Sequence, residues 1–367
     1  MPTKLPEDEL KYWLAFSQVS AIGPRRWQKL SAYFPSLKIA WQANLNEFLR
    51  AGLEFRIAEE LIANRQKINP DRELEKLKRL RGKIITILDD GYPKLLKEVY
   101  APPPLLYYFG NFELNNDFPL AVVGTRKISD YGRLVTEKIV SGLVTAGLTI
   151  VSGLALGIDA CAHEATLKNN GKTIAVLGSG LNQIYPATNR QLAGKIIANN
   201  GAVVSEFPPE MPPLKHNFPQ RNRIISGLSL GTLVTEAGIK SGALITAQFT
   251  LEQNREIFAV PGSIYQNGCQ GPNSLLKMGA KLASNASDII EALSLGQVNE
   301  FRSAKEIMPE TEAEKIILNL LADGSVHVDK LVQSARLDIS VINSTLSLME
   351  MKGMVKNLGN QSYIKAR

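Results

Sequence analysis

The sequence has few of the residues that build covalent or metal-bound frameworks. Of its 367 residues only two are cysteines, Cys161 and Cys269, and only three are histidines. Neither cysteine has a second cysteine at the spacing of a zinc-binding pair. This usage indicates a reducing compartment and argues against a disulfide framework and a zinc cluster. We therefore expect no metal site.

Long hydrophobic runs are also missing. No stretch of about eighteen apolar residues is present, so the sequence predicts no membrane span. The segment Met1–Leu10 turns acidic at once, at Glu7, Asp8 and Glu9, and lacks the apolar core of a secretory signal peptide. We therefore expect a cytoplasmic protein that makes no membrane contact.

The patterns of common catalytic sites are absent as well. The sequence contains no nucleophile elbow, no paired carboxylates, no metal triad and no Walker P-loop. A phosphate pocket without a nucleophile or a metal binds its ligand and does not hydrolyse it. We therefore predict a binding protein with no catalytic residues and no cofactor.

The composition suits a globular protein with a modest basic excess. Hydrophobic residues make up 44% and charged residues 21% of the chain, and the net charge is +7. Residues 1–110 carry 18 basic and 13 acidic side chains, whereas residues 296–367 carry nine of each. This excess is compatible with nucleic acid, but many other proteins share it. A chain of this length predicts two or three domains.

The sequence divides into segments with different patterns. Residues 1–82 place apolar and charged positions at helical spacing and predict an N-terminal helical domain. Residues 83–295 alternate short apolar runs with helical patterns, which indicates an α/β domain with a Rossmann-like, doubly wound and mostly parallel sheet. Residues 296–310 predict a linker. Residues 311–367, with three helical segments and a hairpin, predict a winged-helix domain.

Strands of the α/β domain are expected at eight positions. They are Lys83–Leu88, a short strand within Pro102–Gly110, Leu120–Val123, Thr149–Ser152, Thr173–Leu177, Ala202–Ser205, Gly231–Val234 and Ile257–Val260. Most are short apolar runs, as expected of strands buried on both faces.

In the helical segment, Val19–Leu30 resembles half of a helix-hairpin-helix, with an apolar residue, a glycine turn and a basic helix start. Such a turn contacts phosphate weakly. A plain helix-joining turn explains the same residues, because only one such hairpin is visible.

Arginine follows the first predicted parallel strand, in Gly124-Thr125-Arg126. A dinucleotide fold places Gly-x-Gly-x-x-Gly at this turn. Arg126 takes the place of the second glycine and blocks close approach of a pyrophosphate to the backbone. Its guanidinium is offered instead at the carboxyl end of the strand, where open α/β sheets bind ligands. The turn therefore predicts phosphate binding without a nicotinamide cofactor.

The next two turns are rich in glycine. Ser152 and Gly153 end one strand, and Gly178 and Gly180 follow another with backbone amides suited to an anion. Arg190 comes shortly after them. The pair Asp159 and His163 lies on one helical face; an N-capping aspartate beside a partly buried histidine explains it better than a metal or acid–base site does, because no third ligand is near in sequence. Tyr185 either stacks on a base or packs beneath Pro186.

The most specific segment is Phe218–Ser226, which places Arg221, Asn222 and Arg223 at a predicted helix start. Free amides and the helix dipole favour an anion there. A proline-stiffened loop, Glu206–Pro219, precedes it and reduces the entropy lost on binding. After a later strand, Ser241, Gly242 and Thr246 are expected to close the same pocket, with Lys240 at its rim.

These segments resemble the DNA-processing DprA (Smf) family. The resemblance covers about residues 90–292 and is carried, in order, by Gly124–Arg126, Ser152–Asp159 with His163, Phe218–Arg223, Ser241–Thr246 and Val260–Gly262. It implies a cytoplasmic protein of natural transformation that binds and protects incoming single-stranded DNA. It further implies loading of the RecA recombinase and a homodimer formed through the Rossmann-like domain. Arg126, Arg221, Asn222, Arg223 and the glycines of neighbouring turns would grip phosphates.

Two features depart from that pattern. Family members often carry a lysine just after the Tyr-Pro of the third turn, where this chain has Ala187; Arg190 or Lys240 are candidates to compensate. The predicted third helix of the tail, Ile339–Lys352, has no basic residue before Lys352, whereas a helix that reads a DNA groove brings arginine or lysine. We therefore predict a protein-contact role for the tail.

Two alternatives come from other functional classes. A Rossmann-fold nucleotide phosphoribohydrolase-like enzyme uses a glycine-rich turn followed by glutamate, which Gly231–Glu236 partly matches, but Leu230 stands where further glycine is expected. A winged-helix transcription factor that senses a nucleotide is disfavoured because the third helix of the tail has no basic residue before Lys352.

Overall fold

A computed structural model describes residues 5–295, 311–321, 324–335, 337–351, 354–359 and 361–365. Contacts group the chain into two compact units, residues 1–293 and 294–367, and each is described by itself. The linker predicted at residues 296–310 lies outside the described residues. The boundary predicted between residues 82 and 83 falls inside the first unit and stays a prediction.

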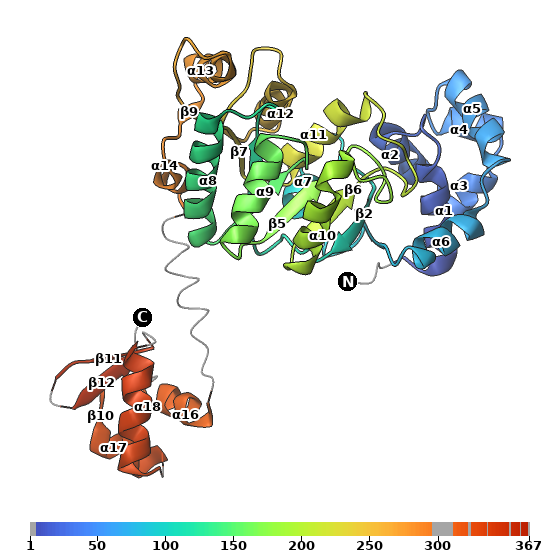
Figure 1. The fold of residues 1–367 in the computed structure, drawn as a ribbon. Coiled ribbons are helices and arrows are strands. Elements are labelled where there is room, and N and C mark those ends of the chain that lie inside the picture. Colours follow the sequence, from blue (N-terminus) through green and yellow to red (C-terminus); the bar gives the residue numbers. More distant parts are fainter. Residues whose placement is uncertain are drawn as a thin grey trace. The chain divides into compact units, whose positions relative to one another are not determined.

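The first unit is built on a nine-stranded sheet with the strand order β1-β2-β6-β5-β4-β3-β7-β8-β9 (Figure 1). The strands are β1 (Lys83–Thr86), β2 (Leu105–Gly110), β3 (Phe118–Val123), β4 (Leu148–Ser152), β5 (Thr173–Val176), β6 (Ala202–Ser205), β7 (Gly231–Val234), β8 (Glu256–Ala259) and β9 (Lys281–Leu282). From β6 to β9 all neighbours are parallel, whereas β1–β2 and β2–β6 are antiparallel. The doubly wound, mostly parallel sheet is thus confirmed.

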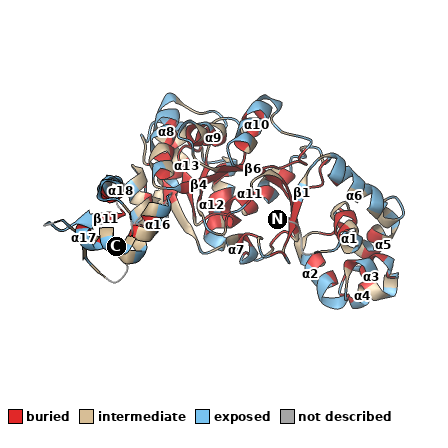
Figure 2. Ribbon diagram, turned by 90° about the horizontal axis from the view of Figure 1, so that it is seen from below, coloured by how far each residue is buried: buried red, intermediate tan, exposed pale blue. Residues whose placement is uncertain are grey.

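Helices cover both faces of this sheet. On one face α8, α9 and α10 pack in sequence, with α14 against α8; on the other, α7, α11, α12 and α13 share a hydrophobic cluster with the strands (Figure 2). The helices are α7 (Lys94–Lys97), α8 (Asp130–Thr145), α9 (Ile158–Lys168), α10 (Arg190–Ala198), α11 (Asn217–Gly227), α12 (Gly242–Glu252), α13 (Gln270–Lys277) and α14 (Ala286–Ala292), with 3-10 turns at Ala187–Asn189 and Asn267–Cys269. Burial on both sides explains why the central strands read as continuous apolar runs.

The N-terminal segment forms six helices next to β1 and β2. They are α1 (Glu7–Ser17), α2 (Pro24–Tyr33), α3 (Leu37–Gln42), α4 (Leu45–Arg50), α5 (Phe55–Arg65) and α6 (Pro70–Arg79). Their apolar faces share one cluster with Leu105 and Tyr107 of β2. The hydroxyls of Ser17 and Tyr107 hydrogen-bond at 2.8 Å across this contact. The helical segment and the sheet therefore share a core.

The second unit holds α16 (Glu312–Leu320), α17 (Val328–Ala335) and α18 (Ile339–Met351), with a three-stranded sheet of β10 (Val326–His327), β12 (Ser362–Lys365) and β11 (Val355–Asn357) in that order. Its own core contains Ile317, Leu331 and Leu346. The predicted three helices and hairpin are confirmed here. In the part of the chain that the structure describes, no helix is both long and apolar enough to cross a membrane.

The order of the parallel strands positions the ligand site. The first of the parallel strands in the sequence is β3. The chain then adds β4, β5 and β6 on one side of it and returns to add β7, β8 and β9 on the other side. The connections after β3 and β7 therefore diverge, which leaves a crevice at the carboxyl ends of these two strands. Open α/β sheets bind their ligands at such a switch point.

Candidate nucleic-acid-binding site

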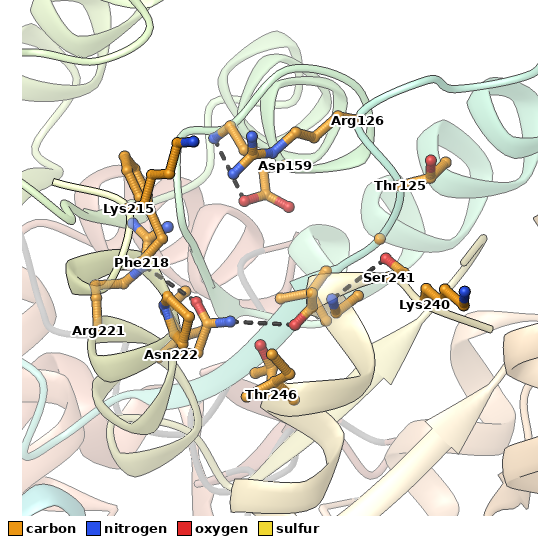
Figure 3. A pocket seen from close by; sticks show the side chains of 18 of the residues that line it. Thr125, Arg126, Asp159, Lys215, Phe218, Arg221, Asn222, Lys240, Ser241 and Thr246 are labelled. Atoms are coloured by element: carbon orange, nitrogen blue, oxygen red, sulfur yellow. Dashed lines mark hydrogen bonds between the residues drawn. The ribbon is translucent and has the colours of Figure 1, made fainter. Parts of the chain in front are cut away.

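A pocket of about 830 Å³ opens at this switch point (Figure 3). Its lining includes Val123 at the end of β3, the loop Gly124–Arg126 that follows, and the start of α12. The predicted site residues that line it are Gly124, Thr125, Arg126, Arg221, Asn222, Lys240, Ser241 and Gly242. Segments about a hundred residues apart in the sequence thus meet at one crevice.

Backbone and side-chain bonds to Glu236 fix the loop after β3. The Thr125 amide donates to the Glu236 carbonyl oxygen at 2.6 Å, and the Ser129 amide donates to Glu236 Oε2 at 3.0 Å. The buried carboxylate fits because position 132 is glycine, where a Cβ would overlap Oε2. Glu236 therefore joins the ends of β3 and β7 and does not line the pocket.

Arg221 forms the buried back of the pocket. Its side chain is 4% exposed, and its Nη1 donates to the carbonyl oxygens of Gly153, at 2.9 Å, and of Val176. Nε donates to Asn222 Oδ1 at 3.2 Å. Within residues 5–295 no group accepts a hydrogen bond from Nη2. The guanidinium is therefore held rigidly through Nε and Nη1, and the two N–H groups of Nη2 remain for a ligand.

Burial sets the protonation of the charged groups at the back of the pocket. Desolvation lowers the pKa of Arg221 to about 10, with nearby Asp159 opposing the shift and Arg126 adding to it. Arg221 remains a cation at neutral pH. Desolvation raises the pKa of Asp159 above its usual range, against the attraction of Arg221.

Phe218 provides an aromatic surface within the pocket. The guanidinium carbons of Arg126 and Arg221 lie 5.7 and 5.9 Å from its ring centroid, and the Tyr185 ring lies at 5.5 Å. Tyr185 is 46% exposed and lines the pocket, so it is available to a ligand. Aromatic rings beside cations are the combination on which single-stranded nucleic acid stacks.

The start of α12 closes the pocket on another side. Ser241 is the N-cap, and its hydroxyl accepts from the Ala243 amide at 3.3 Å. Asn222 Nδ2 donates to the Gly242 carbonyl oxygen at 3.2 Å and so ties α11 to α12. Lys240 is exposed at the rim. A helix N-terminus with a lysine beside it favours an anion.

Arg223 lies away from the pocket. Its Nη2 donates to Glu206 Oε2 and its Nη1 to the Ala101 carbonyl oxygen at 2.7 Å. The two side chains of this ion pair are only 13% and 7% exposed. The prediction that Arg221 and Arg223 stand at the start of their helix is wrong: α11 begins at Asn217, and its first turn includes Pro219, which an N-terminal turn tolerates.

Other predicted site residues are placed beside the pocket and not in its lining. The Ser152 hydroxyl donates to the Val122 carbonyl oxygen at 2.6 Å, and the Gly153 amide donates to Asp159 Oδ2 at 3.2 Å. Gly178 packs beneath the Phe218 ring, and the Gly180 amide donates to the Met211 carbonyl oxygen at 2.8 Å. Arg190 is exposed at the start of α10, outside the lining.

The pocket lining also includes Thr246, which was expected to close it, and Tyr185, which the sequence offered as a stacking residue. Among the lining residues for which the sequence predicted no role in this pocket are Lys215, Phe218 and Asp159. Lys215 is exposed and lies in the proline-rich loop just before α11. Its position in that loop, three residues before Phe218, was the signal that could have identified it.

Asp159 and His163 both hydrogen-bond to neighbouring protein groups. The prediction that Asp159 is the N-cap of its helix is wrong. Gly157 is the N-cap of α9, and the Asp159 carboxylate instead accepts from the turn before it. His163 is fully buried with Nδ1 2.7 Å from the Thr173 hydroxyl oxygen, and desolvation lowers its pKa to about 3. In the described ranges no group of three or more His, Cys, Asp or Glu side chains could hold a metal ion.

Comparison with known proteins identifies the family. A family model for "DNA recombination-mediator protein A" matches residues 83–294, and one for the "DprA winged helix domain" matches residues 302–361. Protein Smf of Synechocystis is 41% identical over 312 residues, which cover 83% of this chain and 78% of that protein. The DNA processing protein DprA of Streptococcus pneumoniae is 47% identical over 56% of this chain and 72% of its own length.

Solved structures agree with this assignment. The crystal structure of S. pneumoniae DprA matches with a TM-score of 0.68 at 37% identity, over 78% of this chain and 98% of that one. A Helicobacter pylori DNA processing protein A, described for its single-stranded DNA binding mode, matches with a TM-score of 0.52 at 30% identity, over 58% and 95%. With its Rossmann-like domain and C-terminal winged helix, the chain belongs to the DprA (Smf) family of DNA-processing proteins.

Proposed function

We propose that the switch-point pocket binds single-stranded DNA without cleaving it. The observation that carries this proposal is the convergence of Arg126, Lys215, Arg221 and Lys240 on one pocket, with Arg126 and Arg221 beside the Phe218 ring. Cations that follow a phosphate backbone, combined with an aromatic platform for unstacked bases, suit a single strand. The DNA-binding relative from H. pylori supports the same assignment.

The phosphoribohydrolase-like alternative has weaker support. It would need the glutamate after the β7 turn to act on a ligand, yet Glu236 is 6% exposed, accepts a hydrogen bond from Ser129 and is not part of the pocket lining. A carboxylate engaged in joining two loops is poorly placed to act on a nucleotide. We therefore propose a non-catalytic role.

The biological role that we propose is protection of incoming single strands in the cytoplasm during natural transformation, and loading of the RecA recombinase onto them. The family whose model matches residues 83–294 is described as a recombination mediator, which supports the loading role. A protein that binds the backbone through phosphates accepts a strand of any sequence, as a general loading role requires.

We further propose a homodimer formed through the Rossmann-like domain. Near the β8–β9 edge, Ile264, Tyr265 and Met278 are 76%, 92% and 72% exposed. A contiguous apolar patch on the surface marks a site that a partner covers, and we propose that these three side chains belong to one. Replacing Tyr265 and Met278 with glutamate should give a monomer in sedimentation velocity, whereas Leu134→Glu on α8 should not; an unchanged dimer in the first variant would exclude this face.

The binding proposal is tested by the salt dependence of oligo-dT affinity. For a single strand each lost phosphate contact reduces the slope of log affinity against log salt by roughly 0.7. Arg126→Ala should weaken binding and lower the slope by about one such step, whereas Arg56→Ala, which removes an exposed arginine of α5, should change neither. Equal slopes for wild type and Arg126→Ala would refute the assignment of this pocket.

A further inference from the structure

A second hollow lies beside the switch-point pocket, on the other side of the start of α11. Its volume is about 240 Å³, and its lining includes Pro24 at the start of α2. His216 and Gln220 line this hollow, whereas Lys215 and Phe218 line the pocket. The start of α11 is therefore a wall that the two hollows share, and α2 lies on the far side of the second one (Figure 1).

The surface that joins the two hollows does not repel a phosphate backbone. Lys215 is exposed at the end of the proline-rich loop before α11. The two acidic side chains of that loop are each paired with a cation: Glu206 with Arg223, and Glu210 with Lys76 at 3.3 Å. Because both carboxylates are neutralised by a partner, a polyanion can cross from the pocket to the second hollow without meeting an unpaired negative charge of this loop.

Beyond the second hollow, a cation lies on an exposed aromatic ring. Arg25 follows Pro24 at the start of α2, and its guanidinium carbon lies 4.4 Å from the centroid of the Tyr100 ring. Tyr100 is 76% exposed, and Arg25 is exposed as well. Within residues 5–295 no carboxylate pairs with Arg25. The same combination, a guanidinium beside an aromatic ring, occurs in the pocket with Arg126 and Phe218.

A purely structural role explains the Arg25–Tyr100 pair less well. The helical segment is already joined to the sheet by a shared hydrophobic core and by the hydrogen bond between the hydroxyls of Ser17 and Tyr107. A contact that only held these two parts together would be covered by them. The high exposure of Tyr100 instead leaves ring surface on which a base can stack, and the Arg25 guanidinium keeps its donors for a phosphate.

We propose that a bound single strand continues from the switch-point pocket across the start of α11 to Arg25 and Tyr100, where Arg25 binds a phosphate and Tyr100 stacks on a base. The inference rests on the proposed binding of single-stranded DNA in the pocket. On this path the N-terminal helical segment is part of the DNA-binding surface. Only strands long enough to leave the pocket gain these contacts, so affinity depends on strand length.

The test measures affinity for oligo-dT of two lengths, about four and about sixteen nucleotides, so that only the longer strand extends beyond the pocket. Tyr100→Leu should weaken binding of the longer strand about fivefold or more, as expected for one lost stacking contact. Arg25→Gln should also weaken it and should lower the slope of log affinity against log salt by roughly 0.7. Both variants should bind the shorter strand as the wild type does.

Two matched controls remove a residue of the same type elsewhere in the helical segment. Tyr33→Leu replaces a 45% exposed tyrosine at the other end of α2, and Arg56→Ala replaces an exposed arginine of α5. Neither should change the affinity for either length. A loss in the controls that equals the loss in Tyr100→Leu and Arg25→Gln would overturn the inference.

Two further results would overturn it. One is unchanged affinity for the longer strand in both Arg25→Gln and Tyr100→Leu. The other is an equal loss at both lengths, because the substitutions would then act through the fold or the pocket and not through an extended path. Failure of the proposed function has a different signature: Arg126→Ala would bind both lengths as the wild type does, and the inference would fail with it.

Discussion

Gly153 and Arg221 approach so closely that no side chain fits between them. A Cβ built on Gly153 would lie 2.7 Å from Nη2 of Arg221 and 2.8 Å from Oδ2 of Asp159. The Gly153 carbonyl oxygen meanwhile accepts from Arg221 Nη1 at 2.9 Å. The Arg221 guanidinium can therefore occupy this position only because the residue directly after β4 is glycine.

Gly153→Ala should displace Arg221 and weaken binding of single-stranded DNA. Loss of one hydrogen bond from a charged donor corresponds to about 1.5–3 kcal/mol, or roughly tenfold or more in affinity. The measurement is fluorescence anisotropy with labelled oligo-dT. Gly194→Ala is the matched control, because a Cβ on this α10 glycine meets nothing within 4 Å. It should leave affinity unchanged; a similar loss in both variants would refute the role of Gly153.

Arg223→Ala should lower stability and leave the DNA affinity of the folded protein nearly intact. Its removal leaves Glu206 buried without a charge partner, which costs about 3–5 kcal/mol. Urea denaturation measures that loss, and oligo-dT titration below the unfolding transition measures affinity. Arg126→Ala should show the reverse pattern, since Arg126 is exposed in the pocket. A large drop in affinity with unchanged stability for Arg223→Ala would place this arginine at the DNA.

The different positions of Arg221 and Arg223 show where sequence reasoning reached its limit. Residues two apart on a helix point to different sides, so the two arginines separate once α11 is known to begin at Asn217. The sequence analysis placed both arginines at the start of the helix, where helical periodicity does not yet separate neighbouring side chains. It therefore assigned both of them to the same site. Pro219 suggested that later start, although the first turn of a helix tolerates it.

The sheet was easier to predict than the site. Strands buried on both faces are apolar throughout, so β3 to β8 are visible as short runs between glycine-rich turns. Strand β9, with two residues of which one is exposed, has no such pattern. Lys215 and Tyr185 lie in loops, where no periodicity indicates the direction of a side chain. Their approach to the pocket depends on how the loops pack.

Acidification should destabilise the protein through His163. The pKa of this buried imidazole falls to about 3 because of desolvation and the charge of Arg221, whereas in the unfolded chain it is near 6.5. Between these values the unfolded state binds more protons, so its contribution to stability is complete above about pH 6.5 and is lost as the pH falls toward 3. The slope approaches about 1.4 kcal/mol per pH unit.

This dependence is measured as the free energy of urea unfolding at several pH values between 7 and 4. His163→Asn retains a polar group near Thr173 but does not titrate, so its curve should be flatter than that of the wild type. The buried carboxyls Asp159 and Glu206, whose pKa values are raised, act in the opposite direction in both proteins. Parallel curves for the two proteins would contradict the assignment to His163.

Deleting residues 306–367 should leave affinity for single-stranded DNA within about twofold, since the pocket lies wholly in the first unit. Lysine and arginine supply the electrostatic part of phosphate binding, and α18, the third helix of the winged-helix domain, has neither within Ile339–Met351. It exposes Ile339 and Leu348 instead, at 54% and 53%, as a surface for a protein partner would. Oligo-dT titration of the truncated protein checks this, with its melting temperature as the folding control. A tenfold loss of affinity in a truncated protein that still folds would show that the winged helix contacts the DNA.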